Sequence, residues 1–122
     1  GQRELSLLVV DAEGIRTINR DYLRRDRPTN VIAFSLTEGD FGDVNTGVLG
    51  DVVVSVETAA REARTAGIPV VDALLYLIIH GILHLAGYDH EGPTGSARAR
   101  IMSAVQQAVF FEIRGYRLDF RL

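Results

Sequence analysis

The sequence predicts an α+β fold, in which a small mixed β-sheet packs against helices within a single domain spanning residues 1–122. Three short runs rich in Val, Ile and Leu are typical of strands, and longer segments with helical periodicity lie between and after them. A length of 122 residues and an apolar content of 47% suit one domain with one ordinary hydrophobic core.

The first part of the chain predicts a strand, a helix and a second strand. The run 5–10 (LSLLVV) is almost continuously apolar, which is typical of a buried strand. Asp11 is suited to cap a helix that reaches about Arg24. The apolar residues of this helix recur at helical spacing and are Ile15, Ile18 and Tyr22. The β-branched and aromatic run 29–36 predicts the second strand.

The middle of the chain predicts a third strand and two helices. A Gly-rich acidic loop at 37–49 precedes the run 50–55, whose three consecutive Val indicate a strand. Good helix formers fill 57–66, and Gly67 follows where a helix ends. A strongly apolar helix then begins at 69 or 70 and is ended by the glycine at 87.

The C-terminal part predicts a long helix and a last strand. Ser96 is suited to cap this helix, and Gly115 is suited to stop it. The alternating run 116–122 (YRLDFRL) is a candidate for the strand. The residues that follow helical spacing are Ile101, Val105, Ala108, Val109 and Glu112.

The composition excludes several classes of protein. The chain has no Cys, so disulfides, cysteine-bound zinc and thiol catalysis are excluded. A net charge of −3 argues against a general nucleic-acid coat protein. No segment has the pattern of a signal peptide or a membrane span, so we expect a soluble, cytoplasmic protein without a membrane partner.

The three histidines of the chain, His80, His84 and His90, lie within eleven residues. His80 and His84 are four apart on a predicted helix and therefore share one face. Gly87 is suited to a left-handed turn that brings His90 back toward them. Three imidazoles would hold one Zn²⁺ per chain and leave a fourth position to water, which is the layout of a catalytic site.

The spacing matches the helix motif of zinc metalloproteases, H-E-x-x-H-x-x-G-x-x-H, with one change. Gly81 stands where the motif places the Glu that acts as general base in peptide hydrolysis. The prediction is thus a zincin-like metal helix on which ordinary proteolysis is disfavoured. The base is left open between Asp89, Glu91 and hydroxide on the metal, with Asp89 named as the catalytic candidate.

The segment 80–90 (HGILHLAGYDH) resembles the signature of the YbeY endoribonucleases, the bacterial 16S rRNA maturation factors. Three further blocks are similar to the family: 27–34 (RPTNVIAF), 49–57 (LGDVVVSVE) and the helix at 11–22. The resemblance covers about residues 5 to 110.

The resemblance implies a zinc-dependent hydrolase that cuts single-stranded RNA in rRNA maturation, including 16S 3′-end processing, and in ribosome quality control. It implies rRNA and the small ribosomal subunit as partners, and no DNA. By position, the family's zinc ligands correspond to His80, His84 and His90.

Two departures from the family pattern concern the N-terminal part. The family usually places an Arg directly after the helix tyrosine, where this chain has Leu23, so either Arg24 substitutes after a small shift or phosphate handling differs. The family also usually has a further segment before the first strand, so we expect either a sheet that lacks an edge or a trimmed sequence.

The segment from Arg16 to Arg27 holds five Arg and two Asp, a local charge of +3. One interpretation is a groove that tracks an RNA backbone, with Arg24 or Arg25 stabilising charge on the reacting phosphate. The other is a solvated helix face whose arginines pair with nearby acids. Arg24 is the catalytic candidate among them.

Five other residues have simpler interpretations. Asn30 is expected to hold its loop through a side-chain to backbone bond, Glu57 to act as an acid in the first turn of a helix, and Met102 to fill the core. Asp51 is either a buried acceptor for a ligand histidine or an edge charge. Tyr88 is suited either to stack on a base or to cap the core.

Three functions remain open on these residues. The first is the zinc endoribonuclease, the second is a metalloprotease-like peptidase, and the third is a non-catalytic ribosome-assembly factor with a structural metal. A fourth ligand position left open to water favours either enzyme, whereas a fourth protein ligand, or no metal at all, favours the assembly factor.

Overall fold

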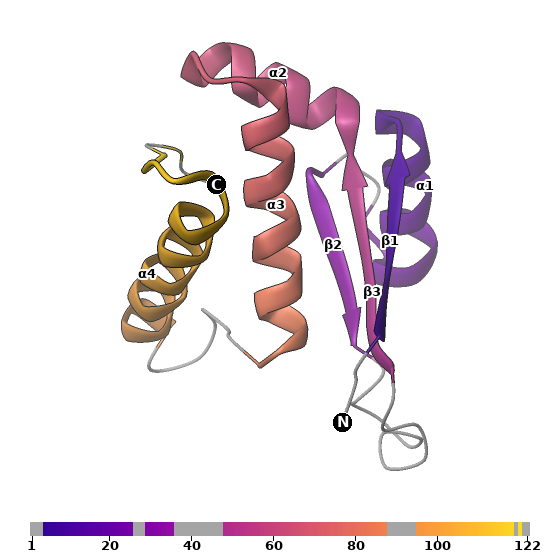
Figure 1. The fold of residues 1–122 in the computed structure, drawn as a ribbon. Coiled ribbons are helices and arrows are strands. Elements are labelled where there is room, and N and C mark those ends of the chain that lie inside the picture. Colours follow the sequence, from indigo (N-terminus) through magenta and orange to yellow (C-terminus); the bar gives the residue numbers. More distant parts are fainter. Residues whose placement is uncertain (1–3, 26–28, 36–47, 88–94, 119, 121–122) are drawn as a thin grey trace.

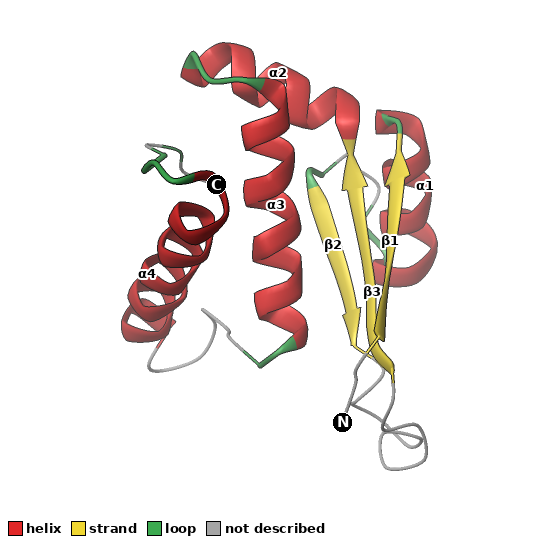
Figure 2. Cartoon of the chain, in the orientation of Figure 1, coloured by secondary structure: helices red, strands yellow, loops and turns green. Residues whose placement is uncertain are grey.

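The computed structural model describes residues 4–25, 29–35, 48–87, 95–118 and 120. These residues form three strands and four helices (Figures 1 and 2). In chain order the elements are β1 (Glu4–Val10), α1 (Ala12–Leu23), β2 (Val31–Ser35), β3 (Val48–Ser55), α2 (Val56–Ala66), α3 (Val70–Leu85) and α4 (Gly95–Arg114). The predicted α+β fold with a small mixed sheet is confirmed.

The sheet has the order β1-β3-β2, with β3 in the centre. Strand β3 is parallel to β1 and antiparallel to β2. Helix α1 covers one face of the sheet and α3 the other, and α4 lies on the far side of α3 (Figure 1). The molecule is therefore layered as α1, sheet, α3 and α4.

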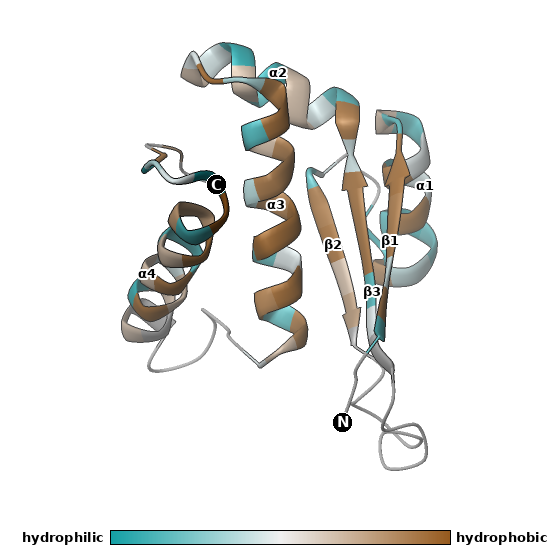
Figure 3. Cartoon of the chain, in the orientation of Figure 1, coloured by the Kyte–Doolittle hydropathy of each residue, from teal (hydrophilic) through white to brown (hydrophobic). Residues whose placement is uncertain are grey.

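Strand β3 supplies the core on both faces of the sheet, because successive side chains alternate between them. Val53 packs with Ile15 of α1, and Val54 packs with Ala59 and Leu77 of α2 and α3. Figure 3 shows the corresponding apolar colouring of β3 and α3. The outer face of α1 is hydrophilic in the same view.

Strand β1 forms as predicted, but the expectation that it is buried is wrong. Its side chains at Leu7, Leu8 and Val9 are 46%, 50% and 52% exposed. The reason is position: β1 is an edge strand that pairs with β3 alone among the described residues.

The helix caps tie α1 to α2. The Gly14 amide donates to Asp11 Oδ1 at 2.7 Å, so Asp11 caps α1 as predicted. The Ala12 amide donates to Glu57 Oε1 at 2.9 Å. Glu57 lies in the first turn of α2, as predicted, and its carboxylate also satisfies a helix-end amide of α1.

Helix α3 approaches the sheet at Gly81, which is buried. A Cβ at this position would lie 2.7 Å from Val52 Cγ1 and 3.3 Å from Val31 Cγ2. Val52 is itself 0% exposed, so it has little space to move. Glycine therefore sets how closely the helix lies on β2 and β3.

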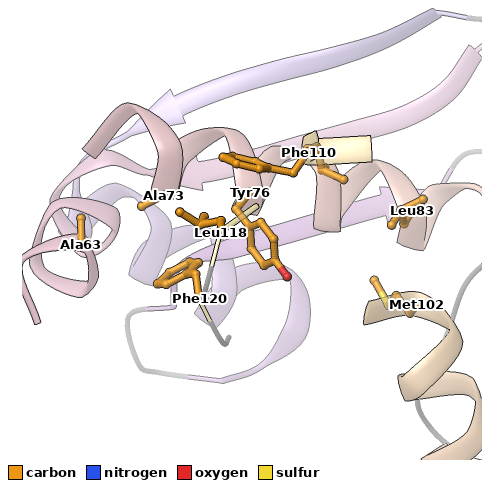
Figure 4. Close-up of a cluster of buried hydrophobic side chains, with 9 residues drawn as sticks. Ala63, Ala73, Tyr76, Leu83, Met102, Phe110, Leu118 and Phe120 are labelled. Atoms are coloured by element: carbon orange, nitrogen blue, oxygen red, sulfur yellow. The ribbon is translucent and has the colours of Figure 1, made fainter. Parts of the chain in front are cut away.

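A second apolar core fills the space between α3 and α4 (Figure 4). The Tyr76 ring lies edge-on to Phe120 and Phe110, with ring centroids 5.4 and 5.9 Å away. Burial in this cluster raises the pKa of the Tyr76 phenol. Leu118 and Phe120 are buried here, and no described residue after Gly115 is in a strand, so the predicted last strand at 116–122 is wrong.

The buried face of α4 differs from the predicted one. Ile101 is 56% exposed, whereas Met102, Gln106 and Phe110 are 2%, 3% and 0% exposed. The predicted face was chosen from the spacing of mainly aliphatic residues, and it did not include the buried Gln106. The role of Met102 as core filler is confirmed. The predicted Ser96 cap is wrong because the helix already includes Gly95.

None of the described helices is by itself long and apolar enough to cross a membrane. Taken together, α2 and α3 are long and apolar enough for a membrane span that is interrupted by a bend, and the bend between them is 117°. The buried core helix of a soluble protein meets the same criterion.

A polar contact joins the start of α3 to the end of α4. The Tyr116 hydroxyl donates to Asp72 Oδ2, and Asp72 is 1% exposed. Arg114 Nε lies 3.2 Å from Asp72 Oδ1 and donates to the Tyr116 oxygen at 3.3 Å. Asp72 Oδ1 has no hydrogen-bond partner among the described residues, so this oxygen is stabilised by the charge of Arg114.

We expect Tyr116→Phe to lower the free energy of unfolding by about 1–3 kcal/mol, because it removes a hydrogen bond from a buried carboxylate. Urea unfolding followed by circular dichroism measures the change. Tyr22→Phe is the matched control, since Tyr22 is 73% exposed and the same deletion there should change stability by less than about 0.5 kcal/mol. Equal effects of the two variants would contradict a stabilising role for Tyr116.

We expect Gly81→Ala to lower the free energy of unfolding by up to about 2 kcal/mol. Overpacking against Val52 costs about 1–3 kcal/mol and the better helix propensity of Ala returns about 1 kcal/mol. A double-mutant cycle with Val52→Ala tests the contact. The double variant should be more stable than the sum of the single effects by at least about 0.5 kcal/mol, and simple additivity would show that the two residues do not press on each other.

Candidate functional site

His80 and His84 form a pair of facing imidazoles on α3. The two Nε2 atoms lie 3.2 Å apart. The ring centroids are 4.7 Å apart and the rings are inclined by 76°. Both residues are partly buried, and their two Nε2 atoms converge on one point.

The pair is positioned by the way α3 packs. Helix α3 presses its glycine, Gly81, against β3, and Ile79 and Leu83 are buried in the cluster shared with α4. The ring of His80 is turned toward α4, where its Nδ1 lies 3.5 Å from Gln106 Oε1. The predicted sharing of one helix face by His80 and His84 is thus present in the structure.

Gln106 is a site residue that the sequence reasoning missed. Its amide Nε2 donates to the Tyr76 carbonyl oxygen at 3.0 Å, and the side chain is 3% exposed. In the sequence, Gln106 could have been noticed because it lies four residues from both Met102 and Phe110. These three residues share the buried face of α4. A buried amide at a core position needs partners, and here one of them is a candidate metal ligand.

The geometry of the pair fits a zinc ion. Two ligand nitrogens about 2.0–2.1 Å from a tetrahedral zinc lie about 3.3 Å from each other, close to the 3.2 Å between the two Nε2 atoms. Imidazole is also a donor that suits zinc. An N–H···N hydrogen bond between neutral rings has a similar length, so the distance suits the metal-free protein as well.

The remaining predicted residues of the metal centre cannot be placed. His90, Asp89, Glu91 and Tyr88 lie outside the described residues. Within the described ranges, no group of three or more His, Asp or Glu side chains is arranged to hold a metal. Gly87 has φ 100°, so the left-handed turn predicted after His84 is present.

The packing of Gly81 bears on the peptidase interpretation. Its Cβ position points at Val52 and Val31 of the sheet. A glutamate there would have to displace buried valine side chains, and its charge would leave water. In the metalloprotease motif this helix position carries the general base. In this fold the same position packs against the sheet and has no space for a glutamate.

Arg24 lies at the end of α1, on the opposite face of the sheet from α3 (Figure 1). It is exposed, and its backbone is left-handed with φ 57°. The structure therefore does not bring Arg24 to the histidine pair, and its catalytic role stays a prediction.

Part of the basic segment 16–27 behaves as a solvent-exposed helix face whose arginines pair with nearby acids. Arg16 lies 3.8 Å from Glu13, and Arg20 lies 3.1 Å from Asp21. Both pairs are formed within α1 and are exposed, so they stabilise the fold little. Arg24 and Arg25 are exposed just after them.

Two further candidates lie away from the pair. Asp51 precedes Val52 on β3, and by strand alternation its side chain lies on the α1 face together with Val53. It therefore does not face the histidines, and no ligand-supporting role follows for it. Asn30 donates to Glu62 Oε1 of α2 at 3.1 Å, and its carbonyl accepts from the Ser55 amide at 2.9 Å. Among the described residues, the Asn30 side chain thus bonds to a carboxylate and not to the expected backbone group.

Comparison with known proteins gives consistent matches. The family model described as "Endoribonuclease YbeY" matches residues 1–114. A relative named Endoribonuclease YbeY from Syntrophus aciditrophicus is 53% identical over 119 residues, covering 98% of this chain and 74% of the relative. One from Geobacter sulfurreducens is 55% identical over 107 residues, covering 88% and 71%.

A solved structure supports the fold. The solution structure of TM1509 from Thermotoga maritima matches with a TM-score of 0.54 and 27% sequence identity. The match covers 98% of this chain and 78% of that protein.

Proposed function

The chain belongs to the endoribonuclease YbeY family, and from this premise we propose that it is a zinc-dependent hydrolase that cuts single-stranded RNA. Its relatives are named as endoribonucleases, which makes a nuclease the supported class of enzyme and RNA the supported substrate. The proposed metal ligands are His80, His84 and His90, with one zinc ion per chain.

One observation carries the proposal: the Nε2 atoms of His80 and His84 lie 3.2 Å apart on one helix face. This separation suits two ligands of the same tetrahedral ion. Zinc at such a site supplies a Lewis acid that acidifies water and offsets charge on a phosphate. The chain's own contribution is to hold the two imidazoles in place through α3.

The finer function rests on the family resemblance. We propose that the substrate is rRNA, that the work includes 16S 3′-end processing and ribosome quality control, and that the small ribosomal subunit is a partner in the cytoplasm. The exposed Arg24 and Arg25 are suited to contact backbone phosphates from the α1 side of the sheet. Asp89 remains the proposed base.

The alternatives predict different outcomes. A peptidase is disfavoured because the motif's general base is replaced by Gly81, whose Cβ position lies 2.7 Å from Val52 Cγ1. A non-catalytic assembly factor would bind zinc and cut neither RNA nor protein.

The experiment compares the wild type with His84→Ala and with Val71→Ala as a control on the same helix, where Val71 is 62% exposed. Bound zinc is measured by mass spectrometry of the metal after chelation and reloading. Cleavage is measured on a labelled single-stranded RNA, its duplex and casein. We expect about one zinc per wild-type chain, cleavage of the single strand only, and loss of zinc binding and at least about 100-fold of the RNA cleavage in His84→Ala.

Val71→Ala should behave like the wild type in both measurements. Equal RNA cleavage by the wild type and His84→Ala would overturn the nuclease assignment, since the activity would not depend on the pair. Cleavage of casein would favour the peptidase, and zinc binding without any cleavage would favour the assembly factor.

A further inference from the structure

We propose that Gln106 is a positioning residue that fixes the tautomer of His80 and thereby directs the Nε2 lone pair of His80 to the metal. The inference deepens the proposed function and rests on it for the role of the metal. It concerns a residue on α4, outside the histidine motif, that is 3% exposed.

The first step is the orientation of the Gln106 amide. A backbone carbonyl oxygen only accepts hydrogen bonds, so the atom 3.0 Å from the Tyr76 oxygen must be the Gln106 nitrogen. The other atom of the amide is then the oxygen, and it lies 3.5 Å from His80 Nδ1. The contact with Tyr76 therefore settles which end of the amide faces the histidine.

The second step is the proton on His80. An amide oxygen cannot donate, so it favours a proton on Nδ1, whereas a lone pair on Nδ1 would face another lone pair. The separation of 3.5 Å is long for a hydrogen bond. At this distance the partial negative charge of the amide oxygen still favours a proton on Nδ1 over a lone pair. Neutral His80 then carries its proton on Nδ1 and its lone pair on Nε2.

The third step is the direction of that lone pair. His80 Nε2 lies 3.2 Å from His84 Nε2, so the unprotonated nitrogen faces the point where the two donors converge. Metal-bound histidines ordinarily donate their other ring N–H to an oxygen acceptor, and losing that acceptor weakens metal binding by about 10- to 100-fold. Gln106 supplies such an acceptor from a different helix.

Tyr76 and His80 are four residues apart, so Gln106 contacts both ends of one turn of α3. The buried amide thus has a partner for its N–H and one for its oxygen, as a polar group in a core requires. This double contact distinguishes a positioning role from core filling, which Leu or Met would perform equally well.

The test uses the wild type, Gln106→Leu, Gln106→Glu and the control Ala108→Leu on the same helix, where Ala108 is exposed. In the metal-free chain, long-range ¹H–¹⁵N NMR at a pH where imidazole is neutral reports which nitrogen of His80 carries the proton. Zinc affinity is measured by competition with a chromophoric chelator. We expect Nδ1–H on His80 in the wild type, and zinc binding weakened about 10- to 100-fold in Gln106→Leu.

Gln106→Glu keeps an oxygen acceptor for His80 Nδ1–H but loses the N–H that donates to the Tyr76 carbonyl, so it should retain Nδ1–H on His80 and lower the stability of the fold. Ala108→Leu should match the wild type. A proton on Nε2 of His80 in the wild type would overturn the inference, whether or not any variant folds. Unchanged tautomer and zinc affinity in a folded Gln106→Leu would also overturn it. If the wild type binds no zinc, the proposed function fails, and the NMR result alone decides the role of Gln106.

Discussion

The close contact between Gly81 and Val52 is the constraint on which the arrangement of the site depends. Because a Cβ at residue 81 would lie 2.7 Å from a buried valine methyl, only glycine lets α3 lie this close to β3. The depth of that helix places His80 and His84 relative to α4. The same contact excludes a glutamate from the helix, so the motif resembles a metalloprotease in spacing and differs from it in the residue that would supply the base.

The histidine pair lies on the part of α3 that packs against α4 as well as against the sheet. On the α4 side, apolar packing around Tyr76 and Phe110 is supplemented by polar contacts at two levels. Asp72 is joined to Tyr116 and Arg114 at the start of α3, and Gln106 reaches the Tyr76 carbonyl and His80 farther along. Helix α3, which carries the proposed metal ligands, is therefore fixed by a sheet on one side and by another helix on the other, which is the kind of rigid support that a preorganised site needs.

Local signals in the sequence were sufficient for much of this arrangement. Asp11, the Val run of β3 and the i, i+4 histidines each act within a few residues, and the cap, the strand and the pair all form as predicted. What failed depends on distant contacts. The exposure of β1, the burial of Phe120 outside any strand and the place of Gln106 are set by which elements become neighbours, and a single sequence does not state this.

The most direct test of the account is zinc K-edge X-ray absorption on the zinc-loaded chain and on His84→Ala. The central claim is that His80 and His84 both bind one ion through Nε2. It predicts imidazole scattering from the wild type, with nitrogen neighbours at about 2.0–2.1 Å, and a spectrum with one imidazole fewer, or no bound zinc, in His84→Ala. Zinc bound without imidazole scattering, or an identical spectrum from the variant, would contradict the claim.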